Sequence, residues 1–175
     1  MSYPEPVYLA DSGEVSATLR PATSSADIVM DSGVRVSYLT TAAQSAGEFG
    51  LYRWDFGEQA AGPAPHFHRS ITESFFVLSG IVTLFDGAET HEAGPGDFLL
   101  VPKGGIHSFR NDHGPASMLI LFTPGAPREG YFELLSQLAA GGFTPTVQEW
   151  AAICAENDQF YPNPDYPSPD YPSPD

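Results

Sequence analysis

Over most of its length the chain alternates apolar and polar residues in short stretches, the pattern of half-buried β-strands. In the clearest stretch, Leu51–Phe56, three aromatic residues fall on one side, and we expect that side to face the core. Further strands are predicted at Glu14–Leu19, Asp27–Met30, Val34–Leu39, Ser74–Leu78, Ile81–Phe85, Glu89–Glu92, Asp97–Val101, Ile106–Arg110 and Ala116–Phe122. Seventeen Gly and seventeen Pro separate such strands by turns, which indicates a sandwich or barrel.

The spacing of apolar residues changes after Pro124. Apolar residues recur at helical spacing through Glu129–Ala140, and the glycine pair that follows provides a stop signal. Thr146 and Glu149 have the spacing of a capping box, which predicts a second short helix ending near Ala155. We expect both helices to pack on the strands as a lid.

The last part of the chain repeats the unit YPxPD, beginning at Tyr161, Tyr166 and Tyr171. Prolines at alternate positions cannot join helices or sheet ladders, so the repeat favours polyproline II or disorder. We interpret this tail as an acidic appendage. The alternative is that one of its tyrosines packs onto the barrel and helps to close a pocket.

Composition excludes several classes of partner. The chain of 175 residues fits one domain, and its formal net charge is -15 with only seven Lys and Arg. A chain so poor in cations offers no basic surface to nucleic acid or to an anionic membrane. Cys154 is the single cysteine, which excludes an intrachain disulfide. The N-terminus has no signal-peptide pattern and no apolar run approaches a membrane span, so we expect a cytoplasmic protein.

Candidate chemistry is concentrated in two short blocks. The first contains His66, His68 and Glu73, and the second contains His107. Three imidazoles and one carboxylate form a ligand set for a divalent transition metal. His66 and His68 are two residues apart, so both point to the same side of a strand, and a turn or bulge before Glu73 can aim its carboxylate at that face.

The spacing of these blocks matches the two motifs of the cupin superfamily. The second motif, G-x5-P-x-G-x2-H-x3-N, runs from Gly96 to Asn111 without a departure. The first, G-x5-H-x-H-x(3,4)-E-x6-G, matches from His66 to Gly80, but its opening glycine does not, because Gly62 is two residues too close to His66. The chain thus resembles the single-domain cupins (monocupins, cupin type 2), and among them the cupins similar to quercetin 2,3-dioxygenase.

This resemblance implies an all-β fold: a small double-stranded antiparallel β-barrel, jelly-roll-like, with short C-terminal helices. The implied organisation is N-terminal strands and turns at 1–33, the cupin barrel at 34–124, packed helices at 125–157 and the tail at 158–175. One divalent transition metal (Fe, Mn, Ni, Cu or Zn) would be held by His66, His68, Glu73 and His107. Cupins of this kind pair as homodimers, and the N-terminal strands offer edges for a second copy.

Strand parity predicts the lining of a pocket beside the metal. Residues two apart share a face, so several aromatic side chains are expected to share the interior with the ligands. The predicted substrate pocket consists of Tyr52, Trp54, Phe75, Phe109 and Phe122. Such a lining suits a flat aromatic or hydrophobic small molecule.

Three functions remain open at this point. The first is a metal-dependent dioxygenase acting on a small aromatic or enolic, flavonol-like substrate, in which the resemblance implies that Glu73 is the catalytic base. Charge balance at the metal is an equally good role for Glu73. The second is a non-catalytic cupin that binds metal or a small molecule. The third is a metal-assisted lyase, isomerase or cyclase, with Tyr52 as its extra acid or base.

Overall fold

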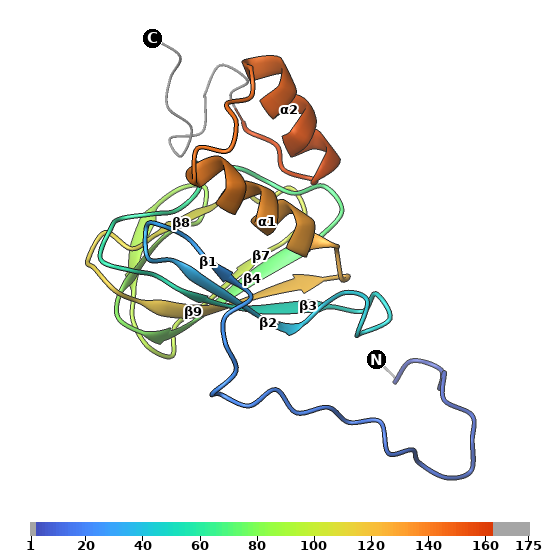
Figure 1. Cartoon of the computed structure of the whole chain (residues 1–175). Helices are drawn as coiled ribbons and strands as arrows, with labels where there is room; N and C mark the ends of the chain where they lie inside the picture. Colours follow the sequence, from blue (N-terminus) through green and yellow to red (C-terminus); the bar gives the residue numbers. More distant parts are fainter. Residues whose placement is uncertain (1–2, 163–175) are drawn as a thin grey trace.

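The computed structural model describes residues 3–162, which form two antiparallel β-sheets with two helices over one end (Figure 1). The larger sheet has the order β1-β2-β3-β9-β4-β7 and the smaller sheet the order β6-β5-β8. The strands are β1 (Ile28–Val29), β2 (Arg35–Thr40), β3 (Gly50–Asp55), β4 (Thr72–Ser79), β5 (Val82–Phe85), β6 (Thr90–Ala93), β7 (Phe98–Val101), β8 (Ser108–Arg110) and β9 (Ser117–Thr123). This confirms the predicted all-β fold with short C-terminal helices, and each predicted strand from Val34–Leu39 onward lies within two residues of an observed one.

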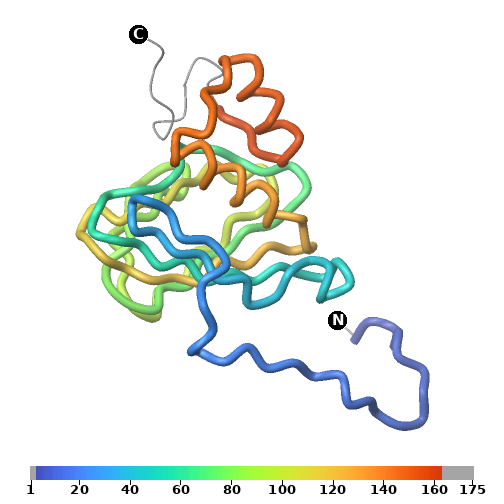
Figure 2. The backbone as a smooth tube through the Cα atoms, in the orientation of Figure 1, coloured from blue at the N-terminus to red at the C-terminus, as the bar shows by residue number. Residues whose placement is uncertain are grey.

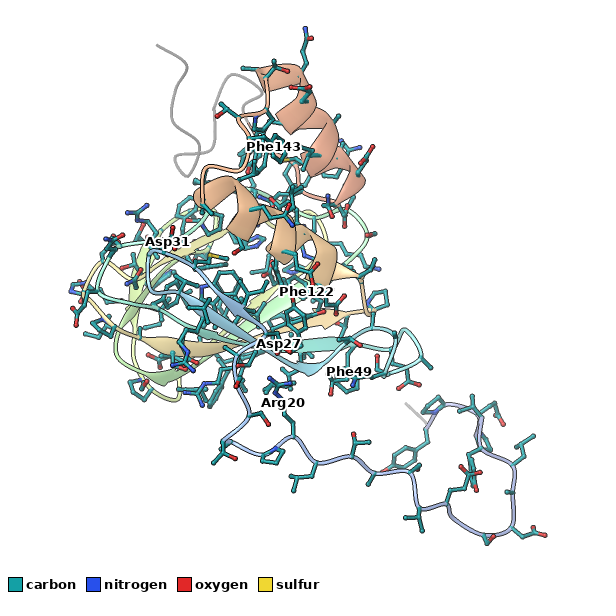
Figure 3. All side chains as sticks on the ribbon, in the orientation of Figure 1. Arg20, Asp27, Asp31, Phe49, Phe122 and Phe143 are labelled. Atoms are coloured by element: carbon teal, nitrogen blue, oxygen red, sulfur yellow. The ribbon has the colours of Figure 1, made fainter. Side chains whose placement is uncertain are left out.

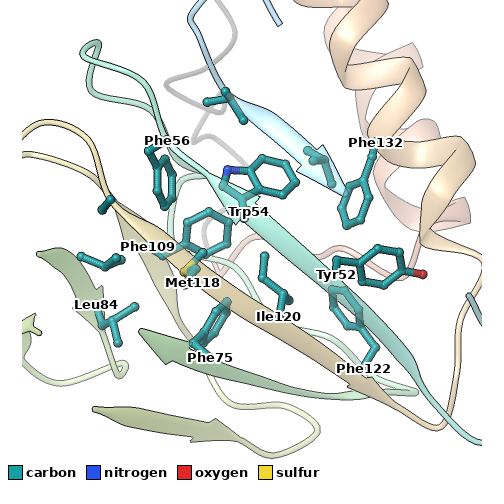
Figure 4. Packing of buried hydrophobic residues seen from close by; sticks show 14 of the residues in the cluster. Tyr52, Trp54, Phe56, Phe75, Leu84, Phe109, Met118, Ile120, Phe122 and Phe132 are labelled. Carbon is teal, nitrogen blue, oxygen red and sulfur yellow. The ribbon is translucent and has the colours of Figure 1, made fainter. Parts of the chain in front are cut away.

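The aromatic side of β3 faces the core, as its alternation predicts. Tyr52 and Trp54 are buried, whereas Arg53 between them is exposed. The smaller sheet contributes Phe109, whose ring centroid lies 6.2 Å from that of Trp54 and 5.3 Å from that of Phe75 (Figure 4). These edge-on and tilted contacts join the two sheets through packed rings, an arrangement that buries a large apolar area.

The two helices lie where the lid was predicted. Helix α1 spans Arg128–Ala139 and lies over the strands (Figure 2). Its Phe132 packs against Tyr52 of β3, with 5.2 Å between the ring centroids (Figure 4). Helix α2 spans Val147–Glu156 and begins at the predicted capping box of Thr146 with Glu149. Among the described residues, no helix has the length and apolar composition needed to span a bilayer.

The chain after α2 returns to the barrel, which differs from the predicted tail boundary at residue 158. Phe160 forms a backbone bridge with Phe67, and their rings stack at 5.6 Å. Residues 158–161 contain no proline, so their backbone is free to pair. Tyr161 packs against the core, whereas the repeat units at Tyr166 and Tyr171 lie outside the described residues.

The N-terminal region corrects a second expectation. Residues 14–19, predicted as a strand, have no strand pairing within residues 3–162, and Val15 and Leu19 are exposed. Strand pairing begins next to Asp27, whose Oδ2 forms an ion pair with Nη2 of Arg20 at 2.8 Å (Figure 3). Strand β2 is paired with β3 over most of its length, but with β1 only at Arg35 and Val36. Homodimer formation stays a prediction.

The last residue of the second motif, Asn111, holds a loop in place. It is 1% exposed, and its amide nitrogen donates to the carbonyls of Gly57 and Gln59 while its oxygen accepts from the N–H of Ala61. A side-chain amide that replaces water for several buried backbone groups stabilises that loop conformation.

We expect Asn111→Ala to lower the free energy of unfolding by about 1–3 kcal/mol, because it leaves buried backbone groups without partners. Chemical denaturation measures the change. Asp112→Ala, at the exposed neighbouring position, is the matched control and should unfold like wild type. Equal stability of the Asn111 variant and the control would contradict this role.

Candidate metal centre

Two backbone segments hold the four candidate ligands. His66 and His107 face each other across an isolated β-bridge, in which each N–H donates to the other carbonyl at 2.9 and 2.8 Å. Glu73 is the second residue of β4, and His68 lies between the bridge and that strand. All four side chains are at most 3% exposed, and one ligand atom of each lies within 4.8 Å of the others.

Backbone carbonyls fix the tautomer of all three imidazoles. Nδ1 of His66 lies 2.8 Å from the carbonyl oxygen of Ala64, Nδ1 of His107 lies 3.0 Å from that of Gly105, and Nδ1 of His68 is bound by a third carbonyl. A carbonyl only accepts, so each Nδ1 carries a proton, and each Nε2 faces the centre, where it offers a lone pair once it is deprotonated. A histidine that ligates a metal needs this arrangement.

The carboxylate sits between two of these nitrogens. Oε2 of Glu73 lies 2.9 Å from Nε2 of His68 and 2.8 Å from Nε2 of His107. Burial disfavours the charge of Glu73, but these contacts outweigh it and hold its pKa well below the usual range. For His107, burial lowers the pKa and the bond to Glu73 outweighs this, so the net shift is upward. Burial, and then the neighbouring His107, lower the pKa of His66.

The donor set fits a divalent transition metal. Neutral imidazole nitrogens and an ionised carboxylate are all acceptors, and acceptors that converge in a buried space need a cation between them. Three nitrogens and one oxygen suit Fe, Mn, Ni, Cu or Zn, whereas Mg and Ca prefer oxygen ligands. The structure thus assembles a buried His/Glu cluster that fits such a metal, of unspecified identity.

A cavity of about 300 Å³ reaches this cluster. Its walls include His66 and Glu73, so two of the four candidate ligands face it. One wall is the loop containing Gly62, where an added Cβ would lie 1.8 Å from the carbonyl oxygen of Phe109. Only glycine permits this close approach, which accounts for the glycine at position 62.

The predicted pocket residues divide into two groups. Trp54, Phe109 and Phe122 line the cavity. Tyr52 and Phe75 are fully buried in the adjoining core and do not line it. Strand parity identifies the inward face but not the depth at which a side chain meets other side chains, so it could not separate the two groups.

The hydroxyl of Tyr52 has a different partner from the one an acid–base role requires. It donates to Oε1 of Glu129 at 2.5 Å. Burial, and then this hydrogen bond, raise the pKa of Tyr52 well above its ordinary value. A proton held in this way, outside the cavity, is unavailable to a bound molecule.

The C-terminal region supplies further cavity residues, of which the sequence suggested only Tyr161, in the alternative interpretation of the tail. Their contacts cross long stretches of chain, so no local pattern marks them; only the helical period of α1 indicates that its apolar side packs inward. The lining residues from this region are Arg128, Tyr131, Phe132, Leu135, Leu138, Ala139, Trp150, Gln159 and Tyr161.

Asp158 connects this region to a candidate ligand. Its backbone carbonyl is the third anchor and binds Nδ1 of His68 at 2.5 Å. Its carboxylate accepts from the N–H groups of Arg69 at 3.0 Å and Ser70 at 2.9 Å, and from the Ser70 hydroxyl at 2.6 Å. The residue therefore clamps both the imidazole and the loop that follows it.

Comparisons with known proteins agree with this fold and site. Residues 52–122 match the family model described as Cupin domain. A stretch of 80 residues is 34% identical to quercetin 2,3-dioxygenase of Bacillus subtilis (strain 168), covering 46% of this chain and 23% of that enzyme. The match thus spans less than a quarter of the length of that relative.

Two solved structures with TM-scores of 0.50 or above share the fold. A predicted oxalate decarboxylase from Thermotoga maritima has a TM-score of 0.53 at 15% identity, covering 62% of this chain and 99% of that chain. The polyketide cyclase RemF from Streptomyces resistomycificus has a TM-score of 0.50 at 23% identity, covering 63% of this chain and 81% of that chain. At such identities, the likeness establishes architecture and no activity.

We expect His107→Ala to lower the affinity for metal by more than the roughly 10–100-fold that is lost when a hydrogen-bond partner of a ligand is removed. Less metal should therefore remain bound after dialysis. Elemental analysis after dialysis measures the content. His113→Ala removes an exposed imidazole and is the matched control, which should keep its metal. Wild-type metal content in the His107 variant would refute the four-ligand site.

Asp158 has a positive φ of 53°, so Asp158→Gly removes its carboxylate without backbone strain. We expect this variant to bind metal about tenfold more weakly, because the loop after His68 loses its clamp. Competition with a chelator measures the affinity. Asp158→Asn keeps an acceptor oxygen and should retain most of it; equal losses in the two variants would contradict the clamp.

Proposed function

We propose that the protein is a metal-dependent dioxygenase acting on a small aromatic or enolic, flavonol-like substrate, a proposal supported by the match of residues 52–122 to the Cupin domain model. The observation that carries the proposal is the position of the cavity. It is lined largely by aromatic and aliphatic side chains, and it reaches His66 and Glu73 of the candidate metal centre. A flat, mostly apolar molecule that binds there meets the ligand side chains directly.

The ligand count supports catalysis rather than a structural metal. Four protein ligands on a six-coordinate metal leave two positions open, whereas structural sites are usually closed. A bound redox-active metal would supply the electron-transfer chemistry that O2 requires, whereas zinc would supply only Lewis-acid chemistry. The aromatic walls exclude water from that space and stack on a planar substrate.

In this proposal Glu73 is the base. Its carboxylate lines the cavity, so an ionised Glu73 can accept the proton of an enol or phenol that binds there. The substrate then carries an anionic oxygen beside the imidazoles. The carbonyl anchors on Nδ1 keep the three rings oriented while the proton moves, because each ring is held at the nitrogen that faces away from the cavity.

Two other functions make different predictions. A non-catalytic cupin binds a ligand in the same cavity without consuming oxygen. A lyase, isomerase or cyclase using Tyr52 is disfavoured, because that hydroxyl lies outside the cavity lining and donates to Glu129.

Oxygen uptake separates these functions. The purified protein is stripped of metal, reloaded separately with Fe, Mn, Ni, Cu or Zn, and mixed with a panel of flavonols in an oxygen-electrode cell. The proposal requires uptake with at least one redox-active metal and none with zinc. Tight flavonol binding without uptake under every metal would replace the dioxygenase by a binding protein.

We expect Glu73→Gln to retain metal, since an amide oxygen still coordinates, and to lower turnover by about 10²–10⁴-fold, the usual contribution of a positioned base. Parallel measurement of metal content and turnover distinguishes the two roles of Glu73. If Glu73 only balances charge, turnover follows metal occupancy. Unchanged turnover at full occupancy eliminates the base.

A further inference from the structure

Arg128 places a buried cation in the wall of the cavity. It is the first residue of α1, is 5% exposed, and lines the same space as His66 and Glu73. Its guanidinium carbon lies 5.1 Å from the ring centroid of Phe122 and 4.7 Å from that of Tyr131. These rings stabilise the cation in part, but they do not replace the hydrogen-bond acceptors that its N–H groups require.

The hydrogen bonding of this guanidinium is incomplete. Nη1 donates to the backbone carbonyl of Asn157 at 2.6 Å, whereas Nε is buried and has no partner. Within residues 3–162 no carboxylate forms an ion pair with Arg128. Nε and Nη2 share the edge that carboxylates bind through two parallel hydrogen bonds, and no acceptor in the described part of the chain occupies that edge.

The nearby carboxylates are engaged elsewhere. Glu129 accepts the hydroxyl of Tyr52, and Glu73 lies between two imidazoles. A guanidinium cannot escape its charge by losing a proton, so a buried one without a counter-ion is costly. Glu73 is the single acid in the described lining, and a divalent metal beside it more than neutralises its charge. A cavity with this balance favours an anion although the chain as a whole is strongly acidic.

We propose that Arg128 forms an anion subsite in this cavity and binds a carboxylate of the substrate, so that the natural substrate is a planar phenolic or enolic acid. This proposal rests on the proposed function, because it takes the cavity beside the candidate metal centre as the substrate site. The phenolic or enolic oxygen lies at the Glu73 end, and the carboxylate replaces the counter-ion that the guanidinium lacks.

Matched ligands test the charge preference without any turnover. We would load the protein with zinc and measure binding of 4-hydroxybenzoate and 4-hydroxycinnamate against their carboxamides by calorimetry. Acid and amide have the same ring and nearly the same shape, so the ratio of their affinities reports the charged contact alone. We expect wild type to prefer at least one acid by about tenfold or more.

Three variants identify the source of that preference. Arg128→Met keeps length and apolar contact, and should abolish the preference while leaving amide affinity within about twofold. Arg128→Lys keeps the charge and should retain part of the preference. Arg53→Met removes an exposed arginine from the outer side of β3 and should behave like wild type. Melting temperature and zinc content are measured for each, because Arg128 also joins α1 to residue 157.

The outcomes separate this proposal from the preceding one. No acid preference in wild type, or equal loss of acid and amide binding in Arg128→Met, would overturn the anion subsite. If Arg128→Met fails to fold, Arg128→Gln decides, since it lacks the charge but can still donate to the carbonyl of Asn157: an unchanged acid-to-amide ratio in this variant assigns Arg128 a purely structural role. A clear acid preference in a protein that never consumes oxygen would leave the subsite standing and remove the dioxygenase.

Discussion

The structure has to bring the ligand atoms of three histidines and one glutamate together at one buried point, and its other features depend on this constraint. Three imidazoles and a carboxylate have to be desolvated together, and each has to be held from behind so that its free atom points inward. The bridge between His66 and His107 sets the spacing of two rings, and β4 brings Glu73 to them. The two helices lie over one end of the sheets (Figure 1), and residues of both helices line the cavity beside this point.

Sequence spacing predicted the part of this arrangement that is local. His66 and His68 share a side because of strand geometry, and the second motif places His107 at the start of a strand that crosses opposite. The same parity correctly placed Tyr52 and Trp54 inside. It could not tell which of them meets the cavity, because that depends on the side chains that α1 brings down from another part of the chain.

Contacts of long sequence separation account for what the sequence did not reveal. Arg128 is a charge at the start of an amphipathic helix, where the usual expectation is a solvated side chain. Its burial depends on rings from β9 and α1 and on a carbonyl at residue 157. Asp158 and Tyr161 belong to a stretch whose composition suggested an appendage. Residues 158–161 nevertheless pack on the sheets, and Phe160 forms a bridge with Phe67, because the first proline of the tail is Pro162.

The carbonyl of Asp158 also has a consequence for the order of events during synthesis. It orients His68 from 90 positions further along the chain, so the complete set of imidazole anchors cannot exist while residue 158 is still inside the ribosome. The two other anchors, at Ala64 and Gly105, are available much earlier. A nascent chain can thus pair its strands before it can hold all three rings in place, and the complete candidate metal centre has to wait until residue 158 has left the ribosome.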